Sequence, residues 1–238
     1  MGAFAELIAL DEADVAPKPT NLSMPEAASV PLVGLTAWQA LVERARLQAG
    51  ERVFVQAGSG GVGSFAIQLA KHIGASVATT VSAANTDLVV DLGADVVIDY
   101  RRQDVAAVLA DYDVVLHSQD AKGLDTSLRI LRPGGRLISI SGPPDPAFAT
   151  QVGAPWFVRP ILCAISAPTL LRARRRKVDY RFLYVRADGA QLEAITSLIE
   201  AGAIRPVIDR TFPFDSTGDA LAAVESGRSR GKVVVVVR

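Results

Sequence analysis

Short apolar runs alternate with helical stretches through the middle of this 238-residue chain. The first apolar run covers residues 52–56 and the last covers residues 136–140. Those between them cover residues 76–81, 95–98 and 113–116. Strands that take turns with helices form a parallel sheet whose crossover helices cover both of its faces. With a sixth strand expected at residues 180–185, the pattern predicts a doubly wound, six-stranded parallel α/β fold.

Further elements are expected on either side of this series. Residues 3–10 are predicted to form a strand, and residues 26–47 a helical stretch that Pro31 and Gly34 interrupt. Near the C-terminus, the pattern predicts two helices and two strands, at residues 190–201, 207–212, 215–225 and 232–237 in chain order. Five consecutive valines make the last strand the clearest of these predictions.

Three glycines, Gly58, Gly60 and Gly63, lie between the first strand of the series and the helix that follows it. In this spacing, Gly58 permits a tight turn, Gly60 lets a pyrophosphate approach the backbone, and Gly63 lets the helix pack closely on the strand. Phosphates bind at such a helix start because its N–H groups are free and its dipole is positive there. The turn therefore predicts a dinucleotide-binding site of the Rossmann type.

The end of the second strand distinguishes between the two nicotinamide dinucleotides. NAD sites usually carry an acidic residue about 20 residues beyond the glycine motif, where it bonds the adenosine ribose. Here no carboxylate follows the strand before Asp87, whereas Ser82 and Asn85 can donate hydrogen bonds to a 2'-phosphate. We therefore predict NADP(H) as the cofactor. The alternative is that Ser82 and Asn85 only cap the next helix.

The charge balance argues against a polyanionic partner. The chain has 25 Lys and Arg residues and 25 Asp and Glu residues, so no net field attracts nucleic acid or an anionic membrane. The five cations within residues 172–177 are interpreted as a solvated helix face, because no aromatic stacking platform accompanies them. A small-molecule substrate is therefore expected, with no nucleic acid and no membrane as partner.

Few residues of this chain could hold a metal ion or cross-link the fold. Cys163 is the only cysteine, and His72 and His117 are the only histidines, with no metal-ligand spacing among them. No signal peptide is recognised, and the apolar stretch at residues 157–171 is too short and too interrupted to span a bilayer. We expect a cytoplasmic protein without a metal site.

A series of landmarks resembles the medium-chain dehydrogenase/reductase superfamily, specifically its zinc-independent, NADPH-dependent quinone oxidoreductase branch. They are residues 2–10, 31–38, 57–63, 92–95, 99–100, 131–135 and 226–232, and so extend over nearly the whole chain. The resemblance implies a Rossmann cofactor-binding domain at residues 34–205. It also implies flanking remnants of a GroES-like β domain at residues 1–33 and at residues 206–238.

The same resemblance implies an activity and a set of cofactor contacts. The activity is hydride transfer from NADPH to the activated double bond of an enone, enal or quinone. The implied contacts are Thr36 beside the nicotinamide, Gly60, Gly61, Val62 and Gly63 on the pyrophosphate, Ser82 and Tyr100 near the adenosine phosphate, Ser118 near the central ribose, and Ile140 and Ser141 along the carboxamide. Zinc-dependent relatives carry a cysteine ligand close to Val33 and Gly34, where this sequence has none.

Two departures from the family pattern matter. Residues 116–120 read Leu-His-Ser-Gln-Asp where relatives usually have an aspartate followed by glycines. His117 is either a proton donor or a polar residue of the cofactor cleft without chemistry, and no catalytic residue is assigned. Relatives also begin with a GroES-like domain, of which only the last strand, residues 2–10, is expected here.

Three functions follow from this reading. The first is an NADPH-dependent reductase, and the second an NADP(H)-binding module that does not catalyse because its substrate domain is missing. The third is a zinc alcohol dehydrogenase whose metal ligands were all lost with the N-terminus. The edge strand at residues 180–185 could also pair with its own copy in a homodimer.

Overall fold

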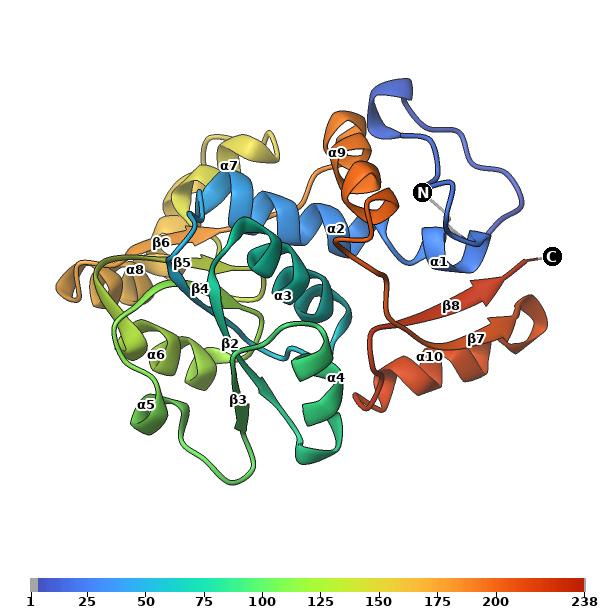
Figure 1. The fold of residues 1–238 in the computed structure, drawn as a ribbon. Coiled ribbons are helices and arrows are strands. Elements are labelled where there is room, and N and C mark those ends of the chain that lie inside the picture. The colour runs from blue at the N-terminus through green and yellow to red at the C-terminus, as the bar shows by residue number, and fades with distance from the viewer. Residues whose placement is uncertain (1–3, 238) are drawn as a thin grey trace.

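Six parallel strands form the central sheet of the protein, in the order β3-β2-β1-β4-β5-β6 (Figure 1). The structure is a computed structural model that describes residues 4–237. The strands are β1 (Arg52–Val55), β2 (Ser76–Val81), β3 (Val96–Asp99), β4 (Tyr112–His117), β5 (Leu131–Ser139) and β6 (Asp179–Phe182). The order confirms the predicted doubly wound sheet. It reverses between β1 and β4, and ligands bind such sheets in the crevice at this switch point.

The central strands are buried along most of their length, because helices cover both faces of the sheet. Val53 pairs with Val77 of β2 on one side and with Val114 of β4 on the other. Val53, Phe54 and Val55 are all fully buried. This continuous burial fixes β1, and with it the position at which the glycine turn begins.

Helices pack on the two faces and enclose two apolar cores. The helices of the sheet domain are α2 (Pro31–Trp38), α3 (Gly61–Ile73), α4 (Thr86–Asp91), α5 (Val105–Val108), α6 (Ala121–Ile130), α7 (Pro146–Gln151), α8 (Val158–Arg175) and α9 (Gly189–Glu200). The short helix α1 (Met24–Ala28) instead lies beside the C-terminal strand pair described below. One core joins Phe65 of α3 and Ile195 of α9 to the sheet, and the other joins Leu128 of α6 and Ala173 of α8 to it. The sheet is therefore buried on both sides.

The predicted N-terminal strand is wrong over the residues described. Residues 4–10 form bends and irregular backbone, and residues 2 and 3 of the prediction lie outside the described residues. Phe4, Leu7 and Ile8 are exposed, so the apolar pattern that predicted a strand meets no neighbouring strand here. The predicted break at Pro31 is confirmed, whereas Gly34 lies inside α2.

The sixth strand is confirmed but is shorter than predicted. β6 covers only Asp179–Phe182, and residues 183–185 are irregular. It pairs with β5 alone, which leaves it at the edge of the sheet.

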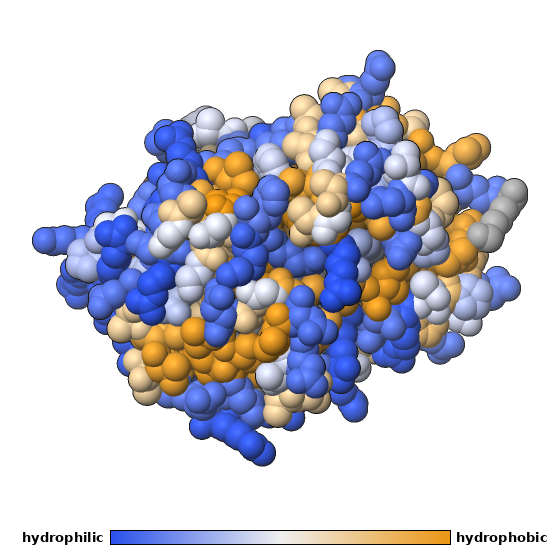
Figure 2. Space-filling view, viewed as in Figure 1, coloured by the Kyte–Doolittle hydropathy of each residue, from blue (hydrophilic) through white to orange (hydrophobic). Residues whose placement is uncertain are grey.

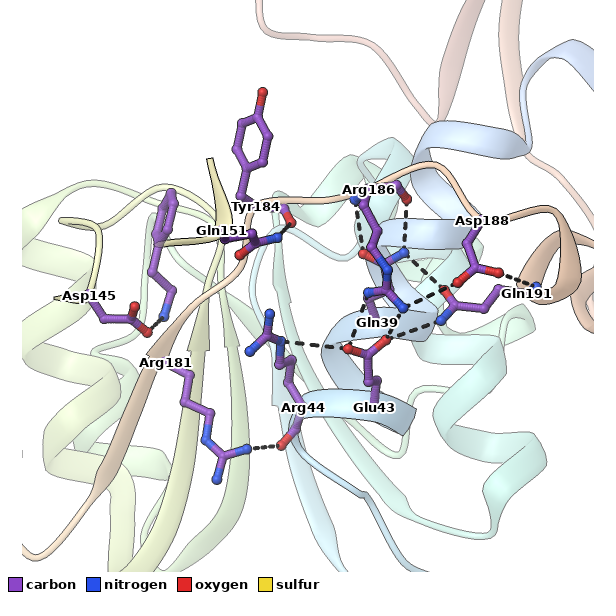
Figure 3. A network of polar contacts seen from close by, with 11 residues as sticks. Gln39, Glu43, Arg44, Asp145, Gln151, Arg181, Tyr184, Arg186, Asp188 and Gln191 are labelled. Atoms are coloured by element: carbon purple, nitrogen blue, oxygen red, sulfur yellow. Dashed lines mark hydrogen bonds and ion pairs between the residues drawn. The ribbon is translucent and has the colours of Figure 1, made fainter. Parts of the chain in front are cut away.

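The segment after β6 is held by a polar network, drawn in Figure 3. It docks on a π-helical segment, Gln39–Arg44, in which Gln39 is fully buried. The Gln39 side chain donates to the carbonyl oxygen of Arg186 (2.9 Å) and accepts from its backbone N–H (3.1 Å). The Arg186 guanidinium lies 2.9 Å from the Glu43 carboxylate, which holds the pKa of Glu43 below its usual value against the opposing effect of its burial. The network fixes the chain between β6 and α9.

A separate two-stranded parallel sheet follows. It pairs β7 (Ile208–Pro213) with β8 (Lys232–Val236), and α10 (Thr217–Glu225) connects the two strands. Both strands were predicted, and each finds the other as its partner. A single bridge between Gly60 and Gly231 joins this sheet to the glycine turn, so the C-terminal segment contacts the expected cofactor site.

The surface of the protein is mixed. On the face shown in Figure 2, apolar patches alternate with hydrophilic side chains. Within residues 4–237, no helix has the length and apolar character needed to cross a membrane.

Candidate functional site

A groove of about 1250 Å³ crosses the carboxyl ends of β1, β2, β3 and β4. Its walls come from the residues that follow these strands, from the start of α6, and from residues 227–230 of the C-terminal segment. Drug-sized pockets have volumes of about 300–1,000 Å³, so this groove has room for a larger ligand. It lies at the switch point of the sheet, where a doubly wound fold binds its ligand.

The three motif glycines have different surroundings. A Cβ atom at Gly58 would overlap the hydroxyl of Thr79, and one at Gly63 would overlap the carbonyl oxygen of Ala57. At Gly60 the only neighbour is that same carbonyl oxygen, at 3.3 Å, and Gly60 lines the groove. Gly58 and Gly63 therefore permit internal packing, whereas Gly60 keeps the backbone open toward a ligand.

Backbone hydrogen bonds hold the turn in this shape. Ala57 adopts the left-handed conformation (φ +53°), and its N–H donates to the hydroxyl of Thr80 (3.2 Å). The N–H of Gly58 donates to the carbonyl oxygen of Thr80 (3.0 Å). α3 then begins at Gly61, and no side chain caps it. Its first N–H groups have no partner within the helix, which makes the start of α3 suited to an anion.

Ser82 and Asn85 both line the groove, at the exit of β2. The Asn85 side-chain amide donates to the hydroxyl of Ser59 (3.0 Å), so the exit of β2 is tied to the glycine turn. Ser82 and Asn85 each precede a short helix, but neither side chain caps it. Capping alone therefore does not account for these two residues.

The groove carries an excess of positive charge. Its cationic residues are Arg101, Arg102, Lys122, Arg129, Arg228 and Arg230, and its acidic residues are Asp104, Asp120 and Asp125. Arg129 lies 3.6 Å from Asp125, and Arg102 lies 3.7 Å from Asp99. The other four cations make no ion pair with any residue among 4–237. Such unpaired cations in a groove raise the local concentration of an anionic ligand.

Sequence reasoning missed the arginines of the C-terminal segment as site residues. Arg228 and Arg230 reach the groove because the N–H of Gly231 donates to the carbonyl oxygen of Ser59 (2.8 Å). Gly231 has a φ of +77°, and a Cβ atom there would overlap the carbonyl oxygen of Val207. The signal that could have found them is the family landmark at residues 226–232, which contains both arginines.

The structure gathers part of the predicted site in the groove. Gly60, Ser82, Asn85 and Tyr100 line it together, and the Arg101 guanidinium lies 5.7 Å from the centre of the Tyr100 ring. The predicted residues outside the groove lining are Thr36, Gly58, Gly61, Val62, Gly63, Ser118, Ile140 and Ser141. Their contacts with a cofactor stay predictions.

Two of these residues are placed by hydrogen bonds near the end of β4. The Ser118 N–H donates to the side-chain oxygen of Gln56 (3.1 Å), and the Ser141 hydroxyl donates to the carbonyl oxygen of Gln119 (2.7 Å). Thr36 is buried in α2, where its hydroxyl donates to the carbonyl oxygen of Leu32 (2.6 Å). Gln56 and Gln119 line the groove, so Ser118 and Ser141 each contact a residue of its wall.

His117 is fully buried at the end of β4 and does not line the groove. Its Nδ1 lies 3.5 Å from the Ser127 hydroxyl, and its Nε2 has no hydrogen-bond partner among the described residues. Burial lowers the pKa of His117 to about 4. The side chain is therefore neutral at neutral pH and behind the groove wall, which supports a structural role rather than proton donation.

The described residues do not fit a zinc ion. Among residues 4–237, no group of three or more His, Cys, Asp or Glu side chains could hold a metal. Cys163 lies on α8 and His72 on α3, while His117 is buried at the end of β4. We therefore derive no step through a metal.

Comparison with known proteins gives the family. Residues 92–235 match the model of the zinc-binding dehydrogenases. A curated relative, the mitochondrial NAD(P)H oxidoreductase RTN4IP1 of Danio rerio, is 33% identical over 99% of this chain and 63% of its own length. The chloroplastic NADPH-dependent alkenal/one oxidoreductase of Arabidopsis thaliana is 35% identical over 98% of this chain and 53% of its own length.

Solved structures show the same relationship. The quinone oxidoreductase from Coxiella burnetii is 29% identical, with a TM-score of 0.78 over 93% of this chain and 63% of that one. The chain thus spans less than two thirds of the relatives named here. The family model matches more than half of the chain, and the six-stranded sheet is that of its structural neighbours. The chain therefore belongs to the zinc-binding dehydrogenase family, within the medium-chain dehydrogenase/reductase superfamily.

Proposed function

We propose that the groove binds NADP(H), and that the protein is an oxidoreductase that reduces an activated carbon–carbon double bond. The observation that carries the proposal is the charge of the groove. Four cations that make no ion pair among residues 4–237 line the groove, and at the exit of β2 Ser82 and Asn85 stand in place of the carboxylate of an NAD site. NADPH differs from NADH by one phosphate. The cations of the groove and the hydrogen-bond donors at the exit of β2 would favour the cofactor that carries this additional anion.

The residues present fit this cofactor. The open backbone at Gly60 and the uncapped start of α3 would hold the pyrophosphate. Ser82, Asn85 and Arg101 would hold the 2'-phosphate, with Arg228 and Arg230 completing the positive groove from the C-terminal segment. When bound, NADPH supplies a hydride. The chain positions the cofactor and supplies the electrostatics.

The substrate class follows from the relatives. Their names include an NADPH-dependent alkenal/one oxidoreductase, a 2-methylene-furan-3-one reductase and a trans-enoyl reductase. We infer that this protein acts on a small molecule of the same kind, an enone, enal or quinone. A cytoplasmic location remains a prediction from the sequence, and relatives include mitochondrial and chloroplastic proteins.

Two measurements test the proposal in sequence. Calorimetric titration with NADPH and NADH should give at least about tenfold tighter binding of NADPH, a difference of about 1.4 kcal/mol. Equal affinities would contradict the cofactor assignment. Absorbance of the reduced nicotinamide, followed with a panel of enones, enals and quinones, then tests the activity.

The outcome separates the two functions that remain open. Turnover with any of these acceptors identifies a reductase. Tight binding of NADPH without turnover by any acceptor would instead identify a cofactor-binding module and would refute the proposed activity.

The edge position of β6 supports a further proposal, that two copies pair through this strand. β6 has β5 on one side only, so its other side can accept a strand from a second copy about a two-fold axis. Size-exclusion chromatography with light scattering should then show a dimer. A monomer at micromolar concentration would exclude this pairing.

A further inference from the structure

The long helix α8 exposes an apolar stripe to solvent. Phe157, Ile161, Ile165 and Leu171 are each half or more exposed, at 50–57%. Trp156, which precedes the helix, is 87% exposed and contacts Phe157 edge to face, with 6.1 Å between ring centroids. Single exposed apolar residues are ordinary, but a stripe along one helix marks an interaction surface.

The opposite side of α8 faces the protein, where Leu170 packs against the core and Leu162 is partly buried. Ser166, Thr169 and Ala173 are its buried residues. The Ser166 hydroxyl is satisfied within the helix, where it donates to the carbonyl oxygen of Leu162 (2.7 Å). A surface helix normally turns its apolar side to the core and its polar side to water. α8 departs from this pattern because its outer face is apolar as well as its inner one, so the outer face suits an apolar partner better than water.

Cations continue this outer stripe toward the end of the helix. Arg172 and Arg175 follow Ile161, Ile165 and Pro168 at spacings of three and four residues, which place them on one helix face. Both arginines are exposed. Residues 146–178 contain six Lys or Arg residues and no Asp or Glu. The net charge of zero for the whole chain therefore conceals a strongly positive segment around this helix.

We propose that the outer face of α8 binds the surface of a membrane that contains anionic lipids. The apolar stripe would lie at the boundary between headgroups and acyl chains, with Trp156 at the interface. Arg172, Arg175 and their neighbours would contact the anionic headgroups. The helix lies on the membrane and does not cross it. This differs from the expectation drawn from net charge, because binding depends on the charge of the contacting face.

A second copy of the chain fits this face less well than a lipid surface does. A two-fold contact brings the same patch of both copies together. Here that would join two acid-free segments, and no carboxylate of residues 146–178 could neutralise the arginines. Anionic headgroups supply the missing negative charge together with an apolar layer.

The test uses the full chain and two kinds of vesicle, one of phosphatidylcholine alone and one of equimolar phosphatidylcholine and phosphatidylglycerol. Co-sedimentation is expected with the anionic vesicles, with weaker binding in high salt. The tryptophan emission should shift to shorter wavelength in the same samples. No binding to either vesicle, or equal binding to both, would overturn the proposal.

Two double variants locate the surface. The change I161S/I165S removes exposed apolar side chains and should lower the fraction bound by about tenfold. The change R172Q/R175Q should remove most of the salt-sensitive part of binding. Leu221→Ser is the matched control, because Leu221 is equally exposed on α10, and it should bind like the unmodified protein.

Folding and self-association are monitored in the same variants. Unchanged NADPH affinity shows that a variant is folded, since the groove is formed by other elements. Unchanged vesicle binding in I161S/I165S would contradict the proposal. So would a shift from dimer to monomer in that variant without any vesicle binding by the unmodified protein, because the stripe would then belong to a contact between copies.

Discussion

The side-chain amide of Asn85 donates a hydrogen bond to the hydroxyl oxygen of Ser59, with 3.0 Å between the two atoms. It joins the exit of β2 to the glycine turn, and both residues line the groove. The carbonyl oxygen of Ser59 meanwhile accepts a hydrogen bond from Gly231, at the start of β8. One turn residue thus connects the two segments that carry the side chains proposed to bind phosphate.

Cofactor preference should reverse when a carboxylate is placed at the exit of β2. The change Ser82→Asp puts a negative charge where the 2'-phosphate is expected, and juxtaposed like charges repel each other by up to several kcal/mol. We expect NADPH affinity to fall by at least about tenfold, with NADH affinity maintained or raised. Calorimetric titration of both cofactors measures this. Ser82→Ala is the control and should change NADPH affinity by less than Ser82→Asp does. If the S82D protein still prefers NADPH, the 2'-phosphate does not bind beside residue 82.

The C-terminal arginines should contribute to cofactor affinity through their charge. The double change R228Q/R230Q removes two cations that make no ion pair among residues 4–237. We expect weaker NADPH binding and a smaller dependence of its affinity on salt concentration, because fewer charges attract the anion. Arg176→Gln, at the exposed residue that directly follows α8 and lies outside the groove lining, is the control. If both proteins bind NADPH alike at every salt concentration, the C-terminal segment is not part of the site.

The parallel sheet and its glycine turn could be predicted because their signals are local. Apolar runs, helix periods and glycine spacing all lie within short windows of the chain. The strand predicted at residues 3–10 failed because a strand also needs a partner, and the described part has none. Arg228 and Arg230 were missed as site residues because only the bond from Gly231 to Ser59 brings them to the groove. Such long-range placement leaves no local pattern.

Alanine substitutions at two of the motif glycines should affect different properties. One should lower the stability of the fold, and the other should weaken cofactor binding. At Gly63 a Cβ atom would overlap the carbonyl oxygen of Ala57, so Gly63→Ala should lower the free energy of unfolding by about 3 kcal/mol. At Gly60 the nearest atom is 3.3 Å away, so Gly60→Ala should cost less than about 1 kcal/mol in stability. Its Cβ atom would instead enter the groove and weaken NADPH binding. Urea unfolding and cofactor titration of both variants check this, and similar unfolding energies for the two would contradict it.

Burial of His117 should make stability depend on pH. Its pKa is lowered to about 4 in the folded protein, from 6.5 in the unfolded chain. The stabilisation is therefore complete above pH 6.5 and is lost as pH falls toward 4, because only the unfolded chain binds the proton in that window. The loss in the free energy of unfolding should amount to about 3 kcal/mol, at up to about 1.4 kcal/mol per pH unit.

Urea unfolding at a series of pH values measures this loss in the unmodified protein and in the variant His117→Phe. The variant keeps every carboxylate, so its curve serves as the control and should be flatter between pH 4 and 6.5; parallel curves would show that His117 does not titrate in this way.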